Sequence, residues 1–238
     1  MELMRLNKWL VDQGVCSRRA ADRAITEGRV TVNGVKPELG VKVDGSETIT
    51  FDGTVVGQNR SKRIYLAYHK PVGIICTSDP LSKDNIIETI NYPERIFHIG
   101  RLDVASSGLI LLTNDGGIVN KILRAEGKNQ KEYIVRIQED VTDDFITALR
   151  EGVMIDGYKT LPCKAVKMGP AMFAITLVEG RNRQIRKMCE ALHRTVVSLK
   201  RIRVMNIRLD DIPPGKWRLL TPEEETTLLT TLNHTPAE

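Results

Sequence analysis

The chain has 238 residues, of which 41% are hydrophobic and 27% charged, and its formal net charge is +5. This composition is sufficient for one large folded domain or for two unequal ones. No run approaches the roughly 20 apolar residues of a membrane-spanning helix, the first residues lack the apolar segment of a signal peptide, and the four cysteines have no metal-binding spacing. We therefore expect a soluble cytoplasmic protein with reduced thiols, which excludes a disulfide-stapled secreted domain and a Cys/His metal site.

The N-terminal part of the chain has the pattern of a small α/β domain. Apolar residues at helical spacing predict a helix from Leu6 that ends at Gly14, and Ser17 is placed to cap a second helix over residues 18–27. Short strands are expected at residues 30–32, 41–43 and 48–51, with Asn33-Gly34 as a hairpin turn. These elements predict a domain over residues 1–56, followed by a polar linker at 57–62.

Residues 63–238 are predicted to form a second, larger domain. Helices are expected at 117–124, 142–149 and 185–192, and a capping box begins a last helix at Thr221. Strands are expected at 64–69, 108–113, 131–137, 163–168, 172–178 and 196–207, with 233–238 as a frayed tail. Because the helices and strands interleave without a regular βα alternation, the pattern predicts an α+β fold with a mostly antiparallel mixed sheet flanked by helices.

One motif carries the clearest chemical signal, the stretch from Gly100 to Gly108 that reads GRLDVASSG. Asp103 precedes a buried strand and follows Arg101 by two positions. A carboxylate at the mouth of a buried strand, beside a cation, is where a fold can expose a reactive acid and keep it ionised. Asp103 is therefore a candidate catalytic residue; the alternative interpretation is an ordinary turn or capping aspartate.

Basic residues are concentrated in the C-terminal third of the chain. From Arg181 to Arg218 there are eleven Lys or Arg residues and three acidic residues, a local net charge of +8 that exceeds the value for the whole chain. This pattern favours a polyanionic partner, of which nucleic acid is the commonest. A solubilising surface is the alternative interpretation.

Three blocks resemble the signature motifs of bacterial ribosomal RNA pseudouridine synthases: Gly100-Arg-Leu-Asp103…Ser106-x-Gly108-Leu, Lys131-x-Tyr133 and Arg181-x-Arg-Gln-Ile-Arg186-Lys-Met. Residues 5–52 resemble the S4 RNA-binding domain of one branch, whose A-type enzymes modify 16S rRNA and whose B-, E- and F-type enzymes modify 23S rRNA. The segment 120–124, before Lys131, is most similar to the F-type enzymes. The resemblance implies site-specific isomerisation of uridine to pseudouridine in a ribosomal RNA stem-loop, without cofactor or metal, and we expect a monomer.

The same resemblance implies roles for individual side chains. Asp103 would be the essential acid, acting either as a nucleophile at C1′ or as the base that removes the C2′ proton. Arg186 would pair with it, and Tyr133 would stack on a base flipped out of the RNA. Leu199 and Ile185 would contact the base as apolar side chains. Arg101 would either contact RNA or support its own loop.

Further basic side chains are expected to bind RNA phosphates, which positions RNA without reading its sequence. The candidates are Arg5, Lys8, Arg18, Arg19 and Arg23 on the two N-terminal helices, and Arg181, Arg183, Lys187, Lys200, Arg201 and Arg203 in the second domain. For each of them, simple solvation of the surface is the alternative.

Other functions share part of this pattern. A non-catalytic S4-type RNA-binding protein would use the same basic surfaces, and a pseudouridine synthase acting on 16S rRNA or tRNA would carry the same motifs. A glycosidase is disfavoured, because such enzymes use two carboxylates about 5–10 Å apart. The neighbouring Asp115 and Glu132 have the pattern of turn and strand-surface residues.

Overall fold

A computed structural model describes residues 3–57, 62–79, 81–124 and 129–234. The chain divides into two compact units. Of the described residues, the first unit contains those up to Arg63 together with Asn114–Gly117, and the second contains Ile64–Thr113 and those from Ile118 to His234. Among the described residues, no helix has the length and apolar character required to cross a membrane.

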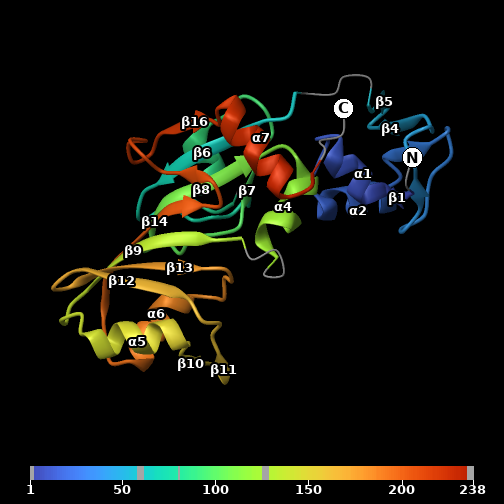
Figure 1. Ribbon diagram of the computed structural model, residues 1–238. Helices are drawn as coiled ribbons and strands as arrows, with labels where there is room; N and C mark the ends of the chain where they lie inside the picture. The colour runs from blue at the N-terminus through green and yellow to red at the C-terminus, as the bar shows by residue number, and fades with distance from the viewer. Residues whose placement is uncertain (1–2, 58–61, 80, 125–128, 235–238) are drawn as a thin grey trace. The chain divides into compact units, whose positions relative to one another are not determined.

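Two short helices and two small sheets form the first unit (Figure 1). The helices are α1 (Leu6–Asp12) and α2 (Arg18–Thr26), and the strands are β1 (Met4–Arg5), β2 (Val30–Val32), β3 (Lys42–Val43), β4 (Ile49–Phe51) and β5 (Thr54–Val55). β1 pairs with β3, and β2, β4 and β5 form a three-stranded antiparallel sheet. Leu6, Trp9 and Leu10 lie in the buried core, as their helical spacing predicts.

Local signals set the ends of these elements. The Ser17 hydroxyl accepts a hydrogen bond of 3.3 Å from the Ala20 backbone N–H and so caps α2. Asn33 and Gly34 have φ values of 52° and 79°, which is the left-handed geometry of the predicted hairpin turn. Both predictions are confirmed.

A nine-stranded sheet dominates the second unit, and Figure 1 shows it running through the whole of this part. Its strands are β6 (Tyr65–Lys70), β7 (Phe97–Ile99), β8 (Ser107–Thr113), β9 (Lys131–Ile137), β12 (Lys164–Gly169), β13 (Met172–Leu177), β14 (Val196–Val204), β15 (Ile207–Arg208) and β16 (Trp217–Leu219). The order is β12-β13-β9-β14-β8-β6-β16, with β15 on β14 and β7 on β8. Among the strand pairs that the structure describes in this sheet, only β14–β8 is parallel, so the predicted mostly antiparallel mixed sheet is confirmed.

Helices cover both faces of this sheet. They are α3 (Ile86–Ile90), α4 (Gly116–Leu123), α5 (Asp143–Glu151), α6 (Gln184–Ala191) and α7 (Pro222–Thr231). One apolar core contains residues of α3, α5 and α6 together with Leu66 and Ile110 of the sheet. A second core contains residues of α4 and α7 together with their neighbours Ala67 and Leu111. This alternation is the two-residue period of a strand buried on both faces.

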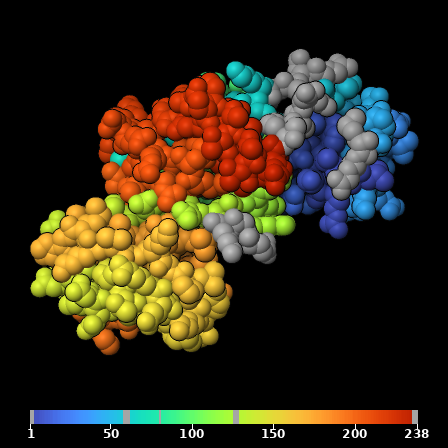
Figure 2. Space-filling model, viewed as in Figure 1, coloured from blue at the N-terminus to red at the C-terminus, as the bar shows by residue number. Residues whose placement is uncertain are grey.

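Figure 2 shows two lobes on the surface of the second unit. The yellow and orange lobe contains α5, β12 and β13, and the red and orange lobe contains α7 and β16. In the strand order, β9 and β14 lie between the elements of the two lobes. These two strands contribute several of the side chains described below.

Some predicted boundaries were wrong. The single strand predicted at 196–207 is two strands, because Met205 adopts a left-handed φ of 52° and turns the chain so that β15 pairs back on β14. The strand predicted at 64–69 is β6, which extends one residue further, to Lys70. The helix α3, the β10–β11 hairpin (Met154–Ile155, Tyr158–Lys159) and the short strands β1, β5, β7 and β16 have no counterpart in the sequence-based prediction.

Two predicted features fall wholly or partly outside the described residues. Residues 58–61 of the predicted linker are among the residues that are not described, as are 235–238 of the predicted tail. The predicted domain limits, 1–56 and 63–238, remain a prediction.

Candidate functional site

A cleft of about 420 Å³ opens in the second unit, and eight of the predicted site residues line it. Its lining includes Arg101, Asp103, Tyr133, Arg181, Arg183, Ile185, Leu199 and Arg201. It also includes Lys131, Glu179 and Gln184, to which the sequence analysis assigned no individual role. Side chains from four separated stretches of the chain therefore meet in one cleft.

Asp103 lies in the loop between β7 and β8, and backbone contacts hold this loop in place. The Ser106 N–H donates to the Asp103 carbonyl at 3.0 Å, closing a tight turn, and the Gly73 N–H donates to the Val104 carbonyl at 2.9 Å. Lys70 is fully buried, and its Nζ donates to the carbonyls of Pro71 and Ile74, so it fixes the segment that supports the loop. The Asp103 side chain is 29% exposed, so it remains open to a ligand.

Arg186 of α6 is the principal partner of Asp103. Its Nε lies 3.9 Å from the Asp103 Oδ2, and its Nη2 donates to the Ala105 carbonyl at 2.9 Å. The Arg186 side chain is only 13% exposed, and burial, reinforced by Arg183, lowers its pKa while Asp103 acts in the opposite direction. An arginine stays protonated under such conditions, so a buried cation faces the carboxylate.

Arg183 supplies a second cation to the same carboxylate oxygen, with its Nη1 3.8 Å from Oδ2 of Asp103. It occupies the cap position before α6 in a left-handed conformation, with a φ of 52°. Because its side chain is 50% exposed, water screens this ion pair and the contribution of Arg183 is small compared with that of Arg186.

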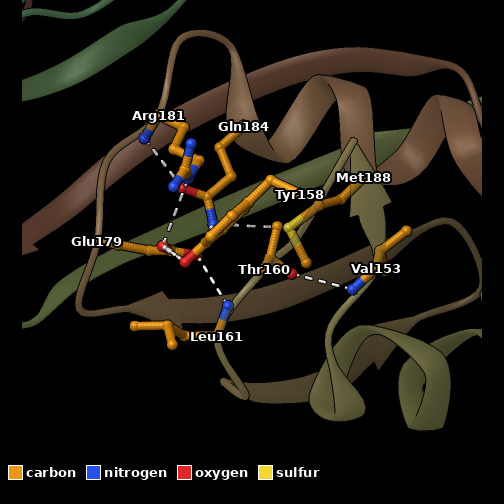
Figure 3. Close-up of polar contacts among 8 residues, drawn as sticks. All are labelled: Val153, Tyr158, Thr160, Leu161, Glu179, Arg181, Gln184 and Met188. Atoms are coloured by element: carbon orange, nitrogen blue, oxygen red, sulfur yellow. Dashed lines mark hydrogen bonds and ion pairs between the residues drawn. The ribbon is translucent and has the colours of Figure 1, made fainter. Parts of the chain in front are cut away.

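A buried carboxylate holds the turn that precedes α6 (Figure 3). The Glu179 Oε1 accepts hydrogen bonds from the Gln184 Nε2 at 2.7 Å and from the Leu161 N–H at 3.0 Å. Its Oε2 accepts from the Tyr158 hydroxyl at 3.2 Å and lies 3.8 Å from the Arg181 Nε. All of these groups converge on Glu179 in Figure 3, so one carboxylate joins the β10–β11 hairpin to the start of α6.

The same turn is closed from its other side. Gln184 uses its Oε1 to accept from the Arg181 N–H at 3.0 Å, and the Arg181 guanidinium carbon lies 3.2 Å from the centre of the Tyr158 ring. Both contacts fix the backbone that places Arg183 in its left-handed conformation. The sequence 179–184 thus positions the two cations that face Asp103.

Aromatic and apolar side chains form another part of the cleft. Tyr133 of β9, Leu199 of β14 and Ile185 of α6 are all buried and all line it. A flat aromatic ring beside aliphatic groups is a surface on which a nucleobase can stack. Arg101 is exposed at the edge of the cleft.

The predicted phosphate-binding residues have different surroundings. In the first unit, Arg5, Lys8 and Arg18 line a hollow of about 270 Å³ together with Lys42, and Arg19 and Arg23 are exposed on α2. In the second unit Lys187 bonds to Asp156, Arg203 pairs with Glu132 at 2.8 Å, Lys200 is exposed, and Arg201 is buried in the cleft. Their roles in RNA binding remain predictions.

The sequence assigned no individual role to Lys131, Glu179 or Gln184, although Lys131 and Gln184 belong to two of the motifs. One signal was available for Lys131, because a residue two positions before Tyr133 on a strand must point to the same face. Among the described residues, no group of three His, Cys, Asp or Glu side chains is arranged to hold a metal ion.

Chemistry on an RNA base suits this cleft, because a flipped base needs an aromatic face to stack on and a charged group beside its sugar. The comparison with known proteins agrees. Residues 64–191 match the family of the RNA pseudouridylate synthases, and residues 4–49 match the S4 domain. The chain belongs to the RNA pseudouridylate synthase family. It is an enzyme that isomerises uridine in RNA to pseudouridine, behind an S4 RNA-binding domain.

Individual relatives resemble the chain over nearly its full length. The dual-specificity RNA pseudouridine synthase RluF of Escherichia coli O6:H1 is 44% identical over 99% of this chain and 81% of the relative. The ribosomal large subunit pseudouridine synthase B of Bacillus subtilis is 37% identical over 97% of both chains. A crystal structure of a pseudouridylate synthase superposes with a TM-score of 0.71 and 28% identity, over 94% of this chain and 99% of the other.

Proposed function

We propose that the protein isomerises a uridine of 23S ribosomal RNA, the RNA of the large ribosomal subunit, with Asp103 as its essential acid. The observation that carries this proposal is the ion pair of Arg186 with Asp103, where Asp103 lines a cleft together with Tyr133. The name of the Bacillus subtilis relative supports 23S rRNA as the substrate.

The reaction requires a carboxylate next to the sugar of the target. The N1–C1′ bond breaks, the uracil turns within the cleft, and a C1′–C5 bond forms; the C5 proton is then lost and N1 gains a proton. Asp103 either attacks C1′ as a nucleophile or removes the C2′ proton as a base, and both routes need a negatively charged group. Arg186 stabilises that charge and fixes the direction of the carboxylate.

The Nε–H of Arg186 is buried and has no hydrogen-bond partner within the described part of the chain. At 3.9 Å from the Asp103 oxygen it is about 1 Å too far for a hydrogen bond. Catalytic hydrogen bonds often form only when substrate closes the site. We therefore assign this N–H to the carboxylate in the RNA-bound state.

The remaining residues hold the base and the RNA. Tyr133 stacks on the flipped uracil, and Leu199 and Ile185 cover its other surfaces, which returns part of the few kcal/mol that unstacking costs. The basic residues of the S4 domain, with Arg181 and Arg183 at the cleft, bind phosphates of a stem-loop. The enzyme acts as a monomer in the cytoplasm.

The direct test is to incubate the protein with unmodified transcripts of 23S rRNA, 16S rRNA and tRNA. Pseudouridine is then mapped by carbodiimide-adduct primer extension. We expect one or a few new stops in 23S rRNA. Modification confined to 16S rRNA or tRNA would refute 23S rRNA as the substrate, and identical maps with and without protein on all three would refute the reaction on these RNAs.

A further inference from the structure

Two positively charged side chains are buried side by side in the cleft. Lys131 of β9 is 6% exposed and Arg201 of β14 is 4% exposed, and both line the cleft. Arg201 lies directly opposite Tyr133 in the β9–β14 register. Lys131, two residues from Tyr133 on β9, points to the same face of the sheet.

These two cations have few hydrogen-bond partners within the described part of the protein. The Lys131 Nζ donates to the Asn129 carbonyl at 3.2 Å, and the Arg201 Nε donates to the Leu109 carbonyl at 2.6 Å. Both partners are neutral. Within the ranges that the structure describes, no carboxylate lies within salt-bridge distance of either cation. Several of the N–H donors of this pair are therefore left for a ligand.

This arrangement is unfavourable for the free protein. Burial, together with the charge of Arg201, lowers the pKa of Lys131 to about 8. Buried charges without a counterion destabilise a fold, and apolar residues of similar size would serve the core better. A buried charge without a counterion, which costs stability, is expected where the residue has a function.

We infer that Lys131 and Arg201 form a phosphate site in the cleft, which binds a phosphodiester group of the RNA next to the flipped nucleotide. Phosphate is the anionic group of RNA, and a guanidinium with an ammonium is a combination that binds it. The position beside Tyr133 places this phosphate near the stacked base. This inference rests on the proposed function, because it assumes that the target nucleotide enters this cleft.

The first experiment measures thermal unfolding of Lys131→Met, with Lys167→Met as the matched control. Lys167 lies on β12 of the same unit, is exposed, and loses the same charge. We expect Lys131→Met to be at least as stable as the wild type, because it removes an unpaired buried charge. Added inorganic phosphate should raise the Tm of this variant less than that of Lys167→Met, at an ionic strength matched with chloride.

The opposite result would overturn the inference. If Lys131→Met unfolds at a lower temperature than the wild type and keeps the full response to phosphate, Lys131 is a structural residue. The basic surface of the S4 domain is also expected to bind phosphate. The test therefore compares the rise in Tm that phosphate causes in Lys131→Met with the rise that it causes in Lys167→Met.

The second experiment measures RNA binding and turnover. Removing one phosphate contact should reduce the slope of log affinity against log salt concentration by about one. Lys131→Met should show this change and a roughly tenfold higher KM, with a smaller change in kcat. Lys131→Arg should restore the slope, and Lys167→Met should retain the wild-type slope.

The two proposals fail separately. If the wild type forms pseudouridine and Lys131→Met keeps its KM and salt slope, the phosphate site is wrong and the proposed function stands. If the wild type forms no pseudouridine in 23S rRNA, binding of the same RNA and the response to inorganic phosphate still test the site.

Discussion

Arg186 contacts the loop of Asp103 through two nitrogens: its Nε lies 3.9 Å from the carboxylate, and its Nη2 donates to the Ala105 carbonyl and, at 3.4 Å, to the Ser106 Oγ. One guanidinium therefore supplies charge to the acid and also fixes the backbone that carries it. These contacts cross from α6 to the β7–β8 loop, so the acid is positioned only when the second unit is folded.

We predict that Asp103→Asn abolishes pseudouridine formation and leaves RNA affinity within about threefold of the wild type. The substitution keeps the shape of the side chain and removes the negative charge that both proposed routes require. Primer extension after carbodiimide treatment measures the product, and filter binding measures the affinity. A variant that still forms pseudouridine at the wild-type rate would exclude Asp103 as the essential acid.

Arg186 and Arg183 should differ strongly in their importance, although each lies within 4 Å of the same oxygen. Arg186→Met should lower kcat by about a hundredfold, because a partly buried charge pair is lost and the Ala105 carbonyl loses its donor. Arg183→Met should change kcat less than fivefold, since water screens its half-exposed ion pair.

Single-turnover rates with saturating RNA separate these effects on chemistry from effects on binding. Arg186→Lys tests the guanidinium itself: it keeps the charge and loses the second contact, so we expect an intermediate rate. Equal rates for Arg183→Met and Arg186→Met would contradict the expectation that the less exposed arginine contributes more to the rate.

Local signals were sufficient to predict much of the fold. The range of β9 was predicted as observed, and Ser17, Asn33-Gly34 and the Thr221 capping box mark the ends of elements as expected. The split between β14 and β15 was not predicted, because Met205 gives no turn signal and its left-handed φ follows from the pairing of its neighbours. Short elements such as α3 depend on tertiary packing rather than on propensity.

The site was predicted in part, and mainly through motif resemblance. The sequence pointed to Asp103, Tyr133 and Arg186, and the structure brings Asp103 together with Arg186 and places Tyr133 in the same cleft. Glu179 was missed because a carboxylate on a charged turn looks like a surface residue. Only the fold places it under Gln184 and the hairpin residue Tyr158.

Glu179 should act as a positioning residue for the cations that face Asp103. Glu179→Ala leaves the donors of Gln184 and Leu161 without their acceptor, so the turn before α6 loosens and Arg183 loses its support. We expect kcat to fall at least tenfold at a temperature well below the Tm, with a smaller change in KM.

Two further variants separate positioning from general destabilisation. Glu179→Gln keeps an acceptor for Gln184 and Leu161 and should recover most of the lost kcat. Glu190→Ala removes an exposed carboxylate from α6, the helix that follows the Glu179 turn, and should leave kcat unchanged. If Glu179→Ala lowers the Tm and keeps the wild-type kcat, the network only stabilises the fold.

Gly108 lies in β8, directly after the loop that carries Asp103, and its replacement should destabilise the protein. Its φ is 111°, and a Cβ there would lie 2.2 Å from the Arg201 carbonyl oxygen, which belongs to the parallel partner strand β14. Backbone in the middle of a sheet cannot move away easily, so Gly108→Ala should destabilise the protein by more than about 2 kcal/mol.

Gly169→Ala is the control. An added Cβ at this glycine meets no atom within 4 Å, so the substitution should change stability by less than about 1 kcal/mol. The midpoints of urea unfolding measure both, and an unchanged midpoint for Gly108→Ala would mean that β8 can shift relative to β14. Because β8 follows the Asp103 loop and β14 carries Arg201, any Gly108→Ala protein that folds should also show reduced turnover.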